Sequence, residues 1–225
     1  MYRLCFKRFF DILFSLMILL LFWWVLALIA VIVRVNLGSP VIFKQNRPGK
    51  AGKIFKLYKF RSMTDARDNE GNLLPDSQRL TKFGRLLRSS SLDELPEIWN
   101  ILKGDMSFVG PRPWSVYYLK FFTEEENRRH EVRPGLTGYA QVNGRTAADW
   151  SERLRYDIKY VDELSIWLDI KIIFLTVKKV LSKSDIVDAE DQGDFDAFRK
   201  KQWKEGVVAK PAWVEDEALM EDHAE

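Results

Sequence analysis

The chain has 225 residues, with 35 lysine and arginine residues against 32 aspartate and glutamate residues and a formal net charge of +3. A balance this even argues against a protein that binds nucleic acid through a concentrated basic surface. The single cysteine, Cys5, excludes an intrachain disulfide and is typical of a reducing compartment. No group of cysteine and histidine residues has the spacing of a zinc site, so any metal is expected to be a hard ion bound by oxygen atoms.

An apolar segment near the N-terminus predicts a membrane anchor over residues 1–36. No charged residue occurs from Ile12 to Val33, and a helix of this length is about 33 Å long, enough to cross the hydrocarbon core of a bilayer. Basic residues flank both ends of the segment, and positive residues prefer the cytoplasmic side. This favours a re-entrant helix that enters and leaves through the same leaflet. A spanning helix stays open, because the segment contains no proline or glycine and has Trp23-Trp24 at its midpoint.

A cluster of basic residues follows the apolar segment. Such a cluster next to a membrane anchor attracts anionic lipid headgroups. An ordinary solvated charged surface would give the same pattern, and both interpretations stay open. The cluster consists of Lys44, Arg47, Lys50, Lys53, Lys56, Lys59 and Arg61.

The periodicity of apolar residues and the turn signals predict an α+β fold that is mainly helical with a small β-hairpin or sheet. Residues 37–184 are expected to form one compact domain, and residues 185–225 an acidic, irregular tail with at most one short helix. The helix expected over residues 169–182 has an apolar stripe, which fits both an amphipathic helix at the membrane interface and a core helix. The expected strands are 40–43, 54–60 and 139–143, and the expected helices are 79–88, one beginning near Asp93, 114–129, 149–164 and 169–182.

Two adjacent carboxylates, Asp93 and Glu94, lie near a predicted helix start. The sequence Ser91-Leu92-Asp93-Glu94 fits a capping box, in which Ser91 and Glu94 each bond to the backbone N–H of the other. Acidic residues also favour this end of a helix. Pro96 lacks a backbone donor and should distort the first turn. From the residues alone a cap is the simpler interpretation, and a functional dyad is the alternative.

Basic residues that could bind phosphate lie on both sides of this dyad. Arg112 stands between Pro111 and Pro113, which stiffen the backbone, and a guanidinium on a stiff loop suits bidentate binding of phosphate. An arginine that pairs with a surface acid would look the same in the sequence. Weaker candidates are Lys59 on the predicted strand, Arg88 just before Ser91, and Arg145 at the end of the turn Asn143-Gly144-Arg145.

Motifs rich in charged residues, glycine and proline follow one another along the chain: Lys7-Arg8-Phe9-Phe10-Asp11, Gln45-Asn46-Arg47-Pro48-Gly49, Tyr58-Lys59-Phe60-Arg61-Ser62-Met63, the run from Arg88 to Pro96, the run from Lys103 to Pro113, and Arg133-Pro134-Gly135-Leu136-Thr137-Gly138. In these motifs and their order, the chain from about Phe6 to Leu181 resembles the bacterial sugar transferase family, the monotopic phosphoglycosyl transferases. So many motifs in one order make the resemblance highly specific. One departure concerns the anchor, because the family usually has Ser-Pro where this chain has Trp23-Trp24.

The resemblance implies an enzyme that moves a sugar phosphate from a UDP-sugar to polyprenyl (undecaprenyl) phosphate with release of UMP, the first step of lipid-linked glycan assembly. It implies contact with membrane lipids in the bacterial inner (cytoplasmic) membrane, with the active site on the cytoplasmic face. A carboxylate nucleophile divides one transfer into two steps, and cations offset phosphate charge. The implied roles are nucleophile for Asp93, Mg²⁺ ligand for Glu94, and substrate binding for Lys59, Arg88, Arg112 and Arg145.

A second function stays open beside this one. The chain could serve as a non-enzymatic membrane partner of a glycan assembly complex, with the dyad acting only as a helix cap. The sequence also does not specify the sugar, the glycan pathway, the role of the acidic tail or the oligomeric state, and a homo-oligomer is compatible with it.

Overall fold

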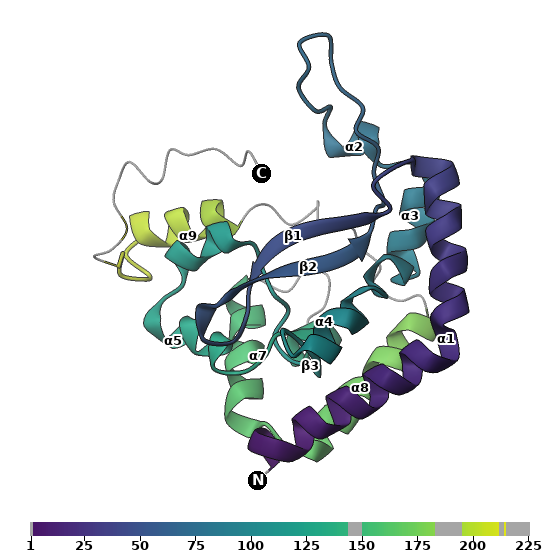
Figure 1. Ribbon diagram of the computed structural model, residues 1–225. Coiled ribbons are helices and arrows are strands. Elements are labelled where there is room, and N and C mark those ends of the chain that lie inside the picture. Colours follow the sequence, from purple (N-terminus) through teal and green to yellow (C-terminus); the bar gives the residue numbers. More distant parts are fainter. Residues whose placement is uncertain (1, 144–149, 183–194, 212–213, 215–225) are drawn as a thin grey trace.

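The computed structural model describes residues 2–143, 150–182, 195–211 and 214. These residues form a mainly helical domain with two small two-stranded sheets, which confirms the predicted fold class. Figure 1 shows the hairpin of β1 (Ile42–Pro48) and β2 (Ile54–Phe60) across the middle of the molecule. The long helix α1 (Lys7–Leu37) follows the base and one side, and α9 (Phe195–Lys204) lies on the other side.

The other elements are short apart from two helices near the end of the domain. They are η1 (Tyr2–Phe6, a π-helix), η2 (Lys50–Gly52), α2 (Asp76–Arg79), α3 (Lys82–Ser89), η3 (Leu92–Glu94), α4 (Glu97–Lys103), β3 (Ser107–Val109), η4 (Val116–Phe121), α5 (Glu124–Asn127), η5 (Arg128–Glu131), β4 (Gly135–Thr137), α6 (Tyr139–Asn143), α7 (Trp150–Glu163) and α8 (Ile166–Ser182).

The N-terminal end of α1 is bonded to the folded domain. The Arg8 guanidinium donates to the carbonyls of Ile101 and Leu102, at 2.6 and 2.7 Å. One oxygen of the buried Asp11 carboxylate accepts from the Ser107 hydroxyl at 3.0 Å. The start of the anchor is therefore attached to α4 and β3.

The C-terminal end of α1 is packed into the same domain, while its middle is exposed. Leu20, Trp23 and Trp24 in this middle section keep more than half of their surface exposed. Figure 1 shows that α1 bends part-way along its length. Within the described part of the chain, α1 is the one helix long and apolar enough to cross a membrane. The packed end consists of Ile29, Val33 and Leu37, which form a cluster with Phe60 and Leu87.

The antiparallel hairpin brings charged side chains of both strands to one face. Strand β2 matches the predicted strand, whereas β1 begins and ends later than predicted because its ladder with β2 runs to Pro48. Paired residues of antiparallel strands lie on the same face, as do alternate residues of one strand. The residue pairs that share this face are Phe43 with Lys59, Gln45 with Leu57, and Arg47 with Phe55.

Three members of the basic cluster are not exposed surface charges: Arg61, Arg47 and Lys59, the last of which is half-buried. Arg61 is buried and donates to the carbonyls of Met63 and Ser39, at 2.8 and 2.6 Å. Arg47 is half-buried. The lysines at positions 44, 50, 53 and 56 are exposed, so both interpretations of the cluster remain for them.

The parallel strands β3 and β4 approach each other so closely that glycine is required at two positions. A Cβ atom on Gly110 would lie 2.3 Å from the carbonyl oxygen of Arg133. A Cβ atom on Gly135 would lie 2.1 Å from the amide nitrogen of Gly110. Real Cβ atoms do not come this close to backbone atoms. The two glycine-containing motifs therefore lie backbone against backbone, and they fix the base of the loop that carries Arg112.

The prediction of one helix over residues 114–129 is wrong. The segment is divided into η4, α5 and η5. Ser115 and Thr123 each cap a new start, and Thr123 forms a capping box with Glu126. These breaks allow several aromatic side chains of the segment to pack together in one buried cluster. This cluster includes Trp114, Phe121 and Phe122, together with Phe195 of α9.

The prediction of a strand at residues 139–143 is also wrong, because these residues form α6. Tyr139 and Val142 are both buried. Their spacing of three puts them on one face of a helix but on opposite faces of a strand. The amide of Val142 donates to the carbonyl of Gly138 at 3.2 Å, which closes the helical turn.

Helix α8 packs in the core through one face and exposes apolar side chains on another. Ile172 is fully buried in a cluster with Tyr160 and Val161. Trp167 and Phe174 are 77% and 69% exposed. The helix is therefore partly a core helix, and its outer face keeps the apolar character that the sequence suggested for a membrane interface.

Part of the predicted tail folds back onto the domain as α9. Phe195 is fully buried against Phe121 and Phe122. Arg199 is 1% exposed and pairs with Glu126. The helix therefore packs against the aromatic segment that follows Pro113.

Candidate active site

The carboxylate dyad lies on the single turn η3, and the predicted capping box is wrong. Ser91 has a φ of 54°, in the left-handed region, and its side chain makes no capping hydrogen bond. An N-cap residue needs a more extended backbone to bring its hydroxyl onto the following amides. As Pro96 predicted, the helix start is distorted, and the regular helix α4 begins only at Glu97. Asp93 and Glu94 are thus not used as caps.

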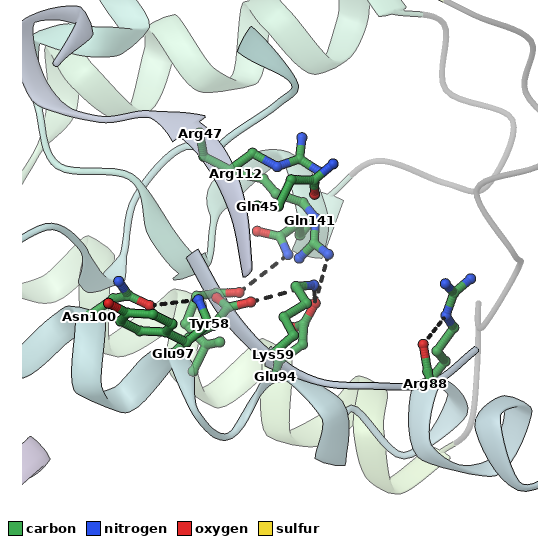
Figure 2. A network of polar contacts seen from close by, with 12 residues as sticks. Gln45, Arg47, Tyr58, Lys59, Arg88, Glu94, Glu97, Asn100, Arg112 and Gln141 are labelled. Carbon is green, nitrogen blue, oxygen red and sulfur yellow. Dashed lines mark hydrogen bonds and ion pairs between the residues drawn. The ribbon is translucent and has the colours of Figure 1, made fainter. Parts of the chain in front are cut away.

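Glu94 is held by two cations that come from different elements. Its Oε1 accepts from Lys59 Nζ of β2 and from Arg112 Nη2 of the loop after β3, each at 2.7 Å (Figure 2). Burial disfavours the ionised carboxyl, but Arg112 and Lys59 outweigh it and lower the pKa of Glu94 to about 2. Glu94 is therefore a fixed anion at neutral pH. The structure brings together three of the predicted site residues at this point.

Asp93 stands in contrast to its neighbour. It is 7% exposed, and within the described part of the chain its carboxylate makes no hydrogen bond or ion pair. Burial raises the pKa of Asp93, against the opposing effect of Lys59 and Arg112. A buried carboxylate without a bonding partner, near positive charge, is suited to attack an electrophile.

Glu97 is a third carboxylate of the site, which the sequence analysis did not identify. It is 3% exposed, and its Oε1 lies 3.4 Å from Lys59 Nζ. Burial and the negative charge of Glu94 raise the pKa of Glu97 to about 7. The signal that could have found it is its position three residues after Glu94, because residues three apart share a helix face.

The other two predicted phosphate-binding residues are not in this network. Arg88 Nε donates to the Ser62 hydroxyl at 3.1 Å, and Figure 2 shows it apart from the Glu94 group. It is nevertheless among the charges that lower the pKa of Asp93, after Lys59 and Arg112. Arg145 lies outside the described residues.

Two buried polar side chains outside the dyad hold the site together. Asn100 of α4 accepts from the Tyr58 amide at 3.0 Å and donates to the Lys56 carbonyl at 2.7 Å, which fastens β2 to α4 (Figure 2). Arg129 pairs with Asp157 and donates to the backbone carbonyl of Arg112 at 2.7 Å. Lys59 and Arg112 are thus brought to Glu94 by structural contacts that the sequence does not reveal.

The carboxylates fit Mg²⁺ as hard oxygen donors. Within the described residues, no group of three or more histidine, cysteine, aspartate or glutamate side chains is arranged to hold a metal. One carboxylate oxygen of Glu94, Oε1, is already bonded to two cations, Lys59 and Arg112. The dyad therefore provides at most part of a coordination shell. This suits Mg²⁺, which usually takes one or two protein carboxylates and completes its shell with water and substrate phosphates.

Comparison with known proteins decides the family. The family model described as bacterial sugar transferase matches residues 2–183. The chain belongs to the bacterial sugar transferase family. This sugar transferase is 53% identical over 180 residues to the uncharacterized sugar transferase EpsL of Bacillus subtilis (strain 168), an alignment that covers 80% of the chain and 89% of the relative.

Relatives named for a reaction are longer proteins. The UDP-glucose:undecaprenyl-phosphate glucose-1-phosphate transferase of Klebsiella pneumoniae is 44% identical over 188 residues, which cover 79% of the sugar transferase and 40% of that protein. The UDP-N-acetylgalactosamine-undecaprenyl-phosphate N-acetylgalactosaminephosphotransferase of Aeromonas hydrophila is 38% identical over 184 residues, 78% of the chain and 44% of that protein. The match thus spans less than half of each of these two proteins.

Proposed function

We propose that this sugar transferase moves a sugar 1-phosphate from a UDP-sugar to polyprenyl phosphate through a covalent intermediate on Asp93. The observation that carries the proposal is the difference between two adjacent carboxylates. Glu94 is fixed by Lys59 and Arg112, whereas Asp93 is buried without a bonding partner. The reaction names of the Klebsiella and Aeromonas relatives support a UDP-sugar donor and an undecaprenyl phosphate acceptor.

The reaction has two displacement steps at one phosphorus atom. In the first, a carboxylate oxygen of Asp93 forms a bond to the β-phosphorus of the donor. The bond from that phosphorus to the bridging oxygen breaks, and UMP leaves with the electron pair. In the second, an oxygen of polyprenyl phosphate bonds to the same phosphorus. The bond to Asp93 then breaks, which restores the carboxylate and yields a polyprenyl diphosphate-linked sugar.

The positive side chains around the dyad offset the charge of the diphosphate. Arg112 presents a guanidinium on a stiff loop, which suits phosphate oxygens. Lys59 and Arg88 add positive charge near Asp93. Glu94 would hold Mg²⁺, and this ion would neutralise charge on the donor phosphates. Chelation with EDTA is then expected to stop UMP release, and added Mg²⁺ to restore it; release that persists in EDTA would refute the metal requirement.

The anchor α1 is a re-entrant helix whose exposed middle enters one leaflet. Both of its ends pack on the same folded domain, near Asp11 and near Val33. A spanning helix would place these ends on opposite sides of a hydrocarbon core about 30 Å thick. Basic residues flank both ends of the helix and prefer the cytoplasmic side, which supports the cytoplasmic face of the bacterial cytoplasmic membrane for both ends. The exposed apolar face of α8, with Trp167 and Phe174, lies at the membrane interface.

The nucleophile is tested by Asp93→Asn in the purified enzyme. With Mg²⁺ and a panel of UDP-glucose, UDP-galactose and UDP-N-acetylgalactosamine, we expect the wild type to release UMP from at least one donor. We expect Asp93→Asn to release none, and Asp76→Asn, which removes an exposed carboxylate, to act as the wild type. UMP release by Asp93→Asn at the wild-type rate would refute Asp93 as nucleophile, and no release by the wild type would refute the reaction for these three donors.

The topology is tested by Arg3→Cys in a Cys5→Ser background. A membrane-impermeant maleimide is expected to label Cys at position 3 in lysed cells and not in intact cells. Labelling of intact cells would place the N-terminus outside and contradict the re-entrant anchor.

A further inference from the structure

Arg47 is a half-buried cation without a carboxylate partner. Its Nη2 donates to the neutral side chain of Gln45 at 2.6 Å, and within the described residues it forms no ion pair. Its Nε is sealed from solvent and has no hydrogen-bond partner, whereas Nη1 is unbonded but not sealed. A buried polar group that stays unpaired costs free energy unless a ligand or water satisfies it. Arg47 is therefore an incomplete anion-binding group.

This cation lies beside the site described above. The hairpin register places Arg47 on the same face as Lys59. Burial and then the positive charge of Arg112 lower the pKa of Arg47 to about 10. Figure 2 shows the side chains of Arg47 and Arg112 on the same side of Glu94. Glu94 pairs with Arg112, whereas Arg47 forms no ion pair within the described residues and feels the charge of Glu97 only without a bond to it.

Arg112 connects this cation to the carboxylate dyad. It bonds to Glu94, the neighbour of Asp93, and it is one of the charges that lower the pKa of Asp93. Arg47 in turn interacts with Arg112. Arg112 is therefore a cation that affects both Asp93 and Arg47. A phosphate bound by Arg47 and Arg112 would lie beside the phosphate that Asp93 attacks.

We propose that Arg47 and Arg112 form a second phosphate subsite, which binds the α-phosphate of the nucleotide donor and then the phosphate of the lipid acceptor. This rests on the reaction proposed above. In an in-line displacement, the leaving oxygen departs opposite the attacking atom. The acceptor oxygen must later attack from that same side, because Asp93 occupies the other. Arg47 would stabilise the negative charge that UMP gains on leaving, and it would then hold the acceptor phosphate in the same place.

Gln45 completes the subsite as a positioning residue. A carboxylate in its place would neutralise Arg47 and compete with phosphate. A carboxamide orients the guanidinium through one hydrogen bond and leaves its full charge for a ligand. The subsite therefore depends on a neutral partner at position 45.

The test compares Arg47→Gln and Arg47→Lys with a matched control, Lys44→Gln. Lys44 is exposed on the same strand, and its side chain alternates to the opposite face. Two measurements distinguish binding of the donor's α-phosphate from binding of the acceptor's phosphate. The first measures exchange of labelled UMP into the UDP-sugar that the wild type uses, without acceptor. The second measures the KM for polyprenyl phosphate in the complete reaction.

We expect Arg47→Gln to raise the UMP concentration for half-maximal exchange and the KM for the acceptor by about ten- to a hundredfold, the usual effect of losing a charged hydrogen bond. Arg47→Lys should bring both values part of the way back to those of the wild type, and Lys44→Gln should change neither value. An effect in one measurement only would refute the shared subsite, and an effect in neither would refute Arg47 as a phosphate ligand. Because Arg47 has no carboxylate partner, its substitution should not lower the unfolding temperature. No UMP exchange by the wild type would refute the reaction itself, a result distinct from both.

Discussion

The free energy of unfolding should depend on pH through the buried carboxyl group of Glu97. Its pKa is raised from 4.5 to about 7 in the folded protein. A carboxyl group with a raised folded-state pKa gives its full stabilisation below the unfolded pKa and loses it as the pH rises through the folded pKa. One pKa unit corresponds to about 1.4 kcal/mol. Ionisation of Glu97 should therefore lower the free energy of unfolding by about 3 kcal/mol between pH 4.5 and pH 7.

Glu97→Gln should remove this loss, because glutamine resembles the protonated glutamate. We expect the variant to gain about 3 kcal/mol over the wild type at pH 8, relative to the difference at pH 4.5. Urea unfolding in detergent micelles, followed by tryptophan fluorescence, measures the free energy of unfolding of the variant and of the wild type at each pH. Glu163→Gln serves as the control. It removes a carboxylate that is 56% exposed, so it shows the effect of losing a surface charge. If Glu97→Gln and the wild type kept the same difference at both pH values, Glu97 would not be the buried partner of Lys59 that we describe.

Three further substitutions test the supports of the site. Asn100→Ala leaves two backbone groups of β2 unpaired and should lower the free energy of unfolding by on the order of 3 kcal/mol in the same urea assay. Gly110→Ala forces β3 and β4 apart and should cost at least about 2 kcal/mol. Arg129→Met removes the two bonds that Nη2 of Arg129 donates to Asp157 and to the Arg112 carbonyl, so kcat/KM for UMP release should fall about tenfold, the usual effect of losing a charged hydrogen bond. An unchanged value in any of these measurements would contradict the corresponding contact.

The sequence predicted the residues that meet at Glu94 better than it predicted the elements around them. Asp93, Glu94 and Arg112 stand in short motifs whose resemblance to the family predicted a phosphate site, although Asp93 and Glu94 alone fit a helix cap. The segment 114–129 has a helical composition, yet it is broken, because its aromatic side chains gain more by burial against α9 than by continuing one helix. Such packing depends on residues far away in the sequence. A local pattern does not contain this information.

The same limit explains the site residues that were missed. Glu97 and Arg47 look like ordinary charges on a helix and in a basic cluster. The contact of Glu97 with Lys59 and the proposed role of Arg47 next to Arg112 depend on their partly or fully buried positions in the fold. Ser91 shows the opposite case. Its sequence context fits a capping box, but a left-handed backbone at this residue removes the geometry that the box needs.

The two attachments of α1 mean that the enzyme cannot be made soluble by cutting off its anchor. Removal of α1 would uncover Phe60 and Leu87 and would leave the hydroxyl of Ser107 without its carboxylate partner. The exposed middle section around Leu20 and Trp23 makes few contacts with the domain, so polar substitutions there are the less damaging route. The helix proposed as the membrane anchor is therefore also part of the hydrophobic core of the folded domain, so conditions that release the protein from lipid must also keep this core covered.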